Sequence, residues 1–220
     1  YDRDKDQLFV FGQDPAMVLL SYKSWNQWML GFTEEAIATS AEAVTHARRF
    51  EHPHTLAYAL TFAAWLDLSR GDPAAAAAAI AEALEVCEEN RLGIFLALSR
   101  VLEAWRNLAV DPSNEALLAL ETVVEQFEGA GGRLFVPYWL GLIASAHLSL
   151  GRPEKAAATI EAAVLRSEAS QERWCLAELL RMESGVRAAE PEGQPDASLA
   201  RAREVAETQG AAAWLDRLEA

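Results

Sequence analysis

Apolar residues recur three and four positions apart along most of the chain, and short polar stretches separate these segments. In one segment, for example, Tyr58, Phe62 and Trp65 are spaced by four and then three residues. This spacing places the side chains on one face of an amphipathic helix. No stretch alternates apolar and polar residues with a period of two. The pattern therefore predicts an all-α protein.

Four turn sequences recur forty residues apart: GFTEEA, GDPAAA, DPSNEA and GRPEKA begin at positions 31, 71, 111 and 151. The helix after each turn carries two columns of mostly small residues: Ala36, Ala76, Ala116, Ala156, and then Ala43, Ala83, Val123, Ala163. The first helix of each copy, including a fifth copy that lacks this turn, carries its own small column: Ser24, Ala64, Ala104, Ala144, Ser184. A fixed period of this length indicates stacked helix pairs.

The period divides the chain into repeats. We assign the helix pairs to residues 15–52, 55–90, 93–128, 134–168 and 173–208, after a lead-in segment at 1–14. Residues 211–220 are interpreted as a partial capping helix. In the second pair, RGDP is predicted to be the turn between the helices. Gly71 ends the first helix, Asp72 caps the second, and Pro73 occupies its first turn.

Two families of helix-pair repeats fit this length, the tetratricopeptide repeat at about 34 residues and the HEAT-type repeat at about 40–47 residues. The small residues resemble the tetratricopeptide pattern, because one on the first helix (position 24) is followed by alanines at positions 36 and 43. The resemblance implies a right-handed α-α superhelix, a TPR-like solenoid with lengthened repeats.

Several stretches resemble a narrower group. FGQDPA, HPHTLAYALTFAAWL, GRPEKAAATIEAAV and ERWCLAELLRMESG are similar to the carboxy-terminal repeat region of large bacterial signalling proteins. Those proteins join a nucleotide cyclase or DNA-binding domain to a P-loop ATPase of the AAA/STAND type. The resemblance implies a regulatory or sensing segment whose catalytic parts lie upstream. The chain begins at Tyr1 without a methionine, which agrees with a piece of a longer protein.

Aromatic side chains form the first candidate site. Trp25, Trp65 and Trp105 share one column of the first helices, and Tyr58 and Tyr138 lie two helical turns before that column. One interpretation is a concave groove that binds a partner, since Trp and Tyr are preferred anchors. The other is a buried seam between neighbouring helices. The sequence leaves both open.

A polar column forms the second candidate. Position 27 and its repeats are polar in all five copies: Gln27, Asp67, Asn107, His147, Arg187. If the aromatic column is a seam, the polar column is the better candidate for an exposed, partner-facing surface.

Charge and cysteine usage restrict the partners. The formal net charge of −14 disfavours nucleic acid and anionic membranes, since their phosphates would be repelled. No apolar run reaches the ~20 residues of a membrane span. Cys87 and Cys175 lie far apart within helical patterns and are expected to be free thiols of a cytoplasmic protein.

The sequence predicts an interaction and sensing module without catalytic residues, metal or cofactor. His52 and His54 lack a nearby third ligand, so they make a weak metal site. A peptide or protein partner, or the upstream ATPase domain, is expected in the groove. A small-molecule inducer and self-association into a homo-oligomer are the alternatives.

Overall fold

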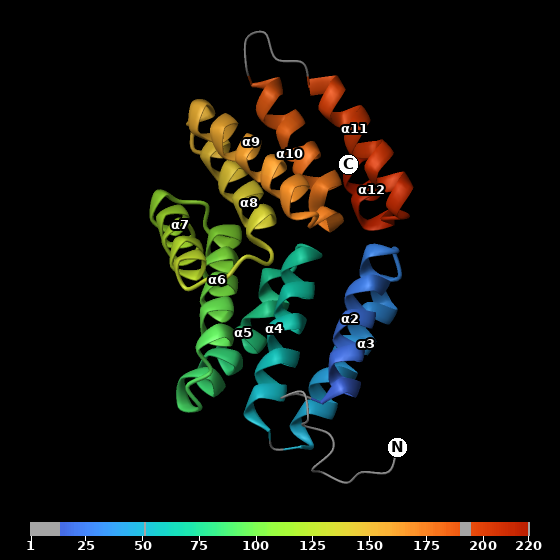
Figure 1. Cartoon of the computed structure of the whole chain (residues 1–220), viewed down its shortest axis with the longest axis vertical. Coiled ribbons are helices and arrows are strands. Elements are labelled where there is room, and N and C mark those ends of the chain that lie inside the picture. The colour runs from blue at the N-terminus through green and yellow to red at the C-terminus, as the bar shows by residue number, and fades with distance from the viewer. Residues whose placement is uncertain (1–13, 51, 190–194, 220) are drawn as a thin grey trace. The chain divides into compact units, whose positions relative to one another are not determined.

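The computed structural model describes residues 14–50, 52–189 and 195–219. These residues form eleven α-helices and one short 3-10 helix and contain no strand, which confirms the predicted all-α class. The chain divides into two compact units, residues 1–110 and 111–220. In each unit, helices pack against their neighbours in sequence order, as in an α-helical repeat (Figure 1).

The first unit contains α2 (Pro15–Met29), α3 (Thr33–Arg48), α4 (Pro53–Ser69), α5 (Pro73–Glu89) and α6 (Gly93–Val110). The helices α2 and α3 form one antiparallel pair, and α4 and α5 form the next (Figure 1). The first helix of the second pair, α4, also packs against both α2 and α6. The predicted alanine columns are buried here, at Ala36, Ala43, Ala76 and Ala83, so the second helices approach their neighbours closely.

The turn between α4 and α5 has the predicted chemistry. Gly71 adopts a φ of +81°, a left-handed conformation that glycine reaches without strain. The Asp72 amide donates to the carbonyl of Asp67 at 2.9 Å, which closes the end of α4. The Asp72 carboxylate accepts from the Ala75 amide at 2.9 Å, and Pro73 is the first residue of α5. RGDP is therefore a helix stop followed by a helix start.

The second unit contains α7 (Asn114–Gly129), α8 (Val136–Ser149), α9 (Pro153–Ser170), η1 (Arg173–Cys175), α10 (Leu176–Ala188), α11 (Pro195–Gln209) and α12 (Ala212–Glu219). The helices α8 and α9 pack as a pair, as do α10 and α11, and α9 also packs against α10 (Figure 1). The predicted capping helix is α12, which packs on α11 and α10. The lead-in expected at 1–14 lies outside the described residues except for Asp14, whose side chain caps α2.

One predicted column needs correction. In α7, Ala116 and Val123 are only half-buried, whereas the next residues, Leu117 and Val124, are buried together with Leu120 and Phe127. The sequence also did not predict the boundary between the two units. The boundary falls inside the third predicted helix pair, with α6 in the first unit and α7 in the second.

Both cysteines are buried free thiols, as expected, and each unit contains one of them. Cys87 lies in α5, and Cys175 closes the short helix η1. Burial raises the pKa of both thiols above the ordinary value.

Candidate partner-binding surface and pocket

The aromatic column is a buried seam over most of its length. Trp65 of α4 and Trp105 of α6 are 4% and 5% exposed, and their ring centroids lie 5.2 Å apart in an edge-to-face arrangement. Tyr58 and Tyr138 are buried as well. Of the two interpretations, the buried seam therefore holds for these four groove candidates, and they do not line an open groove. Their rings fill the space between neighbouring first helices, where edge-to-face contacts add to the burial of apolar area.

Trp25 is the exception, because it is only half-buried. Its ring lies 6.1 Å from that of Trp65 and 6.1 Å from that of Phe62. Tyr22, one turn earlier on α2, is 43% exposed and contacts Phe62 at 5.3 Å. These three residues, Tyr22, Trp25 and Phe62, form what we call the aromatic surface of the first unit.

The aromatic surface packs on the buried rings of Tyr58 and Trp65. The Tyr58 ring stacks on Phe62 with centroids 4.6 Å apart and an angle of 6° between the ring planes. Burial, and then the neighbouring Tyr22, raise the pKa of the Tyr58 hydroxyl above its ordinary range, so this side chain stays neutral. Packing against α4 thus holds the exposed rings of α2 in place.

The polar column has three different environments at its predicted site residues. Asp67 accepts from Arg70 at 3.1 Å, and the same guanidinium reaches Asp72 at 2.9 Å, so this group stabilises the α4–α5 turn. Burial raises the pKa of Asp67, and Arg70 opposes the shift. Asn107 is exposed. His147 is 3% exposed, with its Nε2 atom 2.9 Å from Glu121 Oε1. Of these, only Asn107 lies on an open surface.

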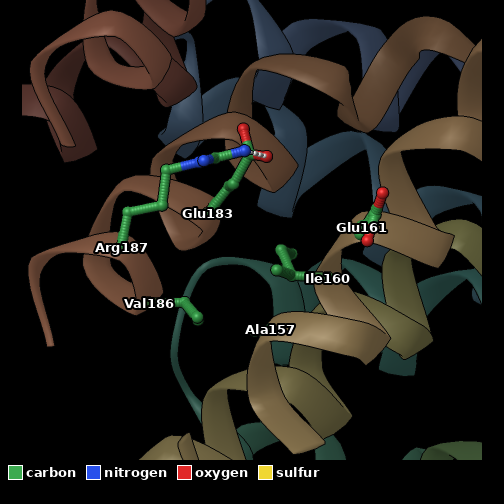
Figure 2. Close-up of a pocket in the computed structure, with 6 residues that line it drawn as sticks. All are labelled: Ala157, Ile160, Glu161, Glu183, Val186 and Arg187. Carbon is green, nitrogen blue, oxygen red and sulfur yellow. Dashed lines mark hydrogen bonds and ion pairs between the residues drawn. The ribbon is translucent and has the colours of Figure 1, made fainter. Parts of the chain in front are cut away.

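Arg187, the fifth member of the polar column, lies at the mouth of a pocket of about 270 Å³ between α9 and α10. Its lining residues are Ala157, Ile160, Glu161, Glu183, Val186 and Arg187 (Figure 2). We call it the α9–α10 pocket. The side chains of Ile160 and Val186 are buried and make its apolar floor.

The two carboxylates of the pocket differ. Glu183 of α10 accepts from Arg187 Nη2 at 2.7 Å and from the Ser198 hydroxyl at 2.8 Å. Glu161 of α9 is exposed and lies across from Glu183, on the other helix that lines the pocket (Figure 2). Within the described part of the chain, Glu161 has no ion-pair partner. The pocket therefore has one neutralised ion pair and one carboxylate that is available to a cation.

A second pocket of about 290 Å³ lies between α11 and the segment that leads into α10. It is lined by Arg173, Leu176, Arg201, Glu204, Val205, Thr208 and Gln209. Its charges are mixed, and the Gln209 amide donates to the Arg173 carbonyl at 2.8 Å, so part of its polar lining is already bonded internally.

No group of three or more His, Cys, Asp or Glu residues within the described ranges is placed to hold a metal ion. None of the helices in these ranges combines the length and the apolar character needed to cross a bilayer. Comparisons of the chain with protein families, with curated proteins and with solved structures found no match.

Sequence reasoning found Trp25 and the polar column but missed Glu161 and Glu183. The signal lay in the repeat itself. Ala157 stands forty residues after Leu117, and a small residue in place of a large one at a repeat position indicates a void.

Proposed function

We propose that this chain is a non-catalytic interaction and sensing module whose aromatic surface binds an apolar segment of a peptide or protein partner. In this proposal it is the tetratricopeptide-like regulatory part of a larger bacterial signalling or transcription-regulating ATPase. It works in the reducing cytoplasm, which its two free buried thiols support. The single observation that carries the proposal is the half-exposed cluster of Tyr22, Trp25 and Phe62.

The aromatic surface suits a partner for two physical reasons. Trp and Tyr side chains dominate binding energy in protein interfaces because they bury a large area. The rings are also preorganised, since Phe62 stacks on Tyr58 and Trp25 contacts Trp65. Binding to rings that are already fixed avoids about 0.5–1.5 kcal/mol of ordering cost for each side chain.

A small-molecule inducer has less support. That alternative expects an enclosed pocket with aromatic walls, whereas the α9–α10 pocket has no aromatic lining and is bordered by the exposed Glu161 and Arg187. Self-association would use the same exposed rings as a partner. Light scattering over a concentration series separates it from partner binding, since a dimer would show a concentration-dependent mass.

Peptide display selected against the whole chain, followed by fluorescence anisotropy, tests the proposal. We expect selected peptides to carry apolar residues and to bind Trp25→Ala and Phe62→Ala about tenfold more weakly or worse. Leu165→Ala, which removes an exposed leucine of α9 in the second unit, is the matched control and should bind normally. Equal binding by all variants, or a metabolite that raises the melting temperature while no peptide binds, would overturn the proposal.

A further inference from the structure

The α9–α10 pocket occupies repeat positions at which the preceding copy holds a close contact between a buried histidine and a partly exposed glutamate. Glu121 and Glu161 are forty residues apart, and so are His147 and Arg187. In the preceding copy, His147 of α8 is buried and its Nε2 atom lies 2.9 Å from Glu121 Oε1 of α7. That copy therefore places a nitrogen base against the carboxylate of the second helix.

Two differences leave this place open in the next copy. The first is size, because Ala157 stands where the preceding copy has Leu117, a fully buried side chain. The second is charge, because Glu183 stands where the preceding copy has Ile143. Glu183 binds Arg187 at 2.7 Å, so the Arg187 guanidinium is held on its own helix. Glu161 of α9 then lines the pocket without an ion-pair partner among the described residues.

We propose that the α9–α10 pocket binds a protonated nitrogen group on an aliphatic stem, such as a lysine or arginine side chain of a partner protein. Glu161 accepts the hydrogen bond of the cation, as Glu121 pairs with His147. Ile160 and Val186 pack against the stem. This site is in the second unit and is separate from the aromatic surface, so it goes beyond the function proposed above.

Size and charge both favour this class of ligand. The volume of about 270 Å³ is below the ~300–1,000 Å³ of pockets that hold drug-sized ligands, and it suits one side chain or a small amine. The charges of Glu183 and Arg187 cancel, so Glu161 gives the pocket a negative net charge. The net charge of −14 also attracts cations to the whole chain, which makes a charge control necessary.

Amide chemical shifts of the ¹⁵N-labelled chain test the proposal by titration with four probes. The cationic probes are N-acetyl-lysine amide, N-acetyl-arginine amide and n-butylamine, and N-acetyl-norleucine amide supplies the stem without charge. We expect saturable shifts at Glu161 and Val186 with the cations and none with norleucine. If the blocked lysine or arginine binds, the natural ligand is a side chain of a partner protein. If only butylamine binds, the natural ligand is a free amine.

Two pairs of variants locate the site. Glu161→Gln should weaken binding about tenfold, whereas Glu207→Gln, which removes an exposed carboxylate of α11 in the same unit, should not. Ala157→Leu restores the bulk of Leu117 and should abolish binding with every charge intact, whereas Ala158→Leu, on the exposed side of α9, should not. Equal weakening by Glu161→Gln and Glu207→Gln would overturn the proposal, because it would mean that the negative net charge of the chain attracts the cations without a specific site. An absence of saturable shifts would overturn it outright, and would leave the aromatic surface untouched.

Discussion

Both units are built from helix pairs, but different contacts hold the first helices of these pairs together in each unit. In the first unit, Trp25, Trp65 and Trp105 contact one another in sequence across α2, α4 and α6. In the second unit, a charged cluster of α10 and α12 lies beside aromatic rings of α8, η1 and α12. Ring contacts occur in both units, and the second unit adds ion pairs at a buried carboxylate, although the repeats of the two units share a period.

The charged cluster centres on Glu178 of α10, which is 1% exposed. Its carboxylate accepts from Arg181 at 2.7 Å and from Arg217 of α12 at 2.6 Å. The Arg217 guanidinium lies 4.9 Å over the ring of Trp214, whose indole N–H donates to the Trp174 carbonyl at 2.9 Å. The carboxylate has both partners because a buried charge without them would be costly. Arg217 and Trp214 also fasten α12 to the unit.

The largest expected effect is in the aromatic seam. Trp105→Ala should lower the free energy of unfolding by about 4 kcal/mol, because it leaves a large cavity beside Trp65. Urea unfolding followed by circular dichroism measures it. Trp25→Ala, at a half-exposed ring of the same column, should cost about half as much. Equal losses for the two variants would contradict a seam that is more tightly packed at Trp105.

Breaking the charged cluster should come next. Arg181→Met should cost about 3 kcal/mol and should speed amide hydrogen exchange in α10 and α12, because Glu178 loses two of its hydrogen bonds. The control is Arg203→Met, which removes an exposed pair with Glu219 and should cost less than about 1 kcal/mol. If exchange rises equally in α4 and α6, the cluster does not stabilise the second unit by itself.

Overpacking an alanine column should have a smaller effect. Ala76→Leu should cost about 2 kcal/mol, because the added carbons have no space where α5 meets its neighbours. Ala78→Leu, exposed on the same helix, should change the free energy of unfolding by less than about 0.5 kcal/mol. A chain that tolerates both changes equally would contradict close approach at the alanines.

The smallest effect concerns pH and is confined to the first unit. Burial, and then the charge of His52, lower the pKa of His54 below its usual 6.5. The unfolded chain therefore binds more protons at this position, so the stability of the first unit should fall as pH drops below about 6.5. Urea midpoints between pH 7.5 and 5.5 measure the trend. His54→Phe should flatten it, and an unchanged slope in this variant would assign the dependence to other groups.

The repeat period predicted most of the fold because it depends on local chemistry. Gly71, Asp72 and Pro73 each have a backbone or capping role that their side chains determine without tertiary contacts. The site was harder to predict, because Trp25 is half-buried and Trp105 is buried although the two residues share one repeat position. The repeat period gives both residues the same position and therefore predicts the same exposure for both. The burial of Leu117 in α7 was missed for a related reason, since Ala116 keeps the period while Leu117 provides the buried contact.

The two buried cysteines can report separately on the opening of the two units. Cys87 belongs to the first unit and Cys175 to the second, and neither thiol is accessible in the folded chain. Alkylation of each thiol therefore requires its own unit to open, and mass spectrometry of the two tryptic peptides would time the two openings separately in an unlabelled sample.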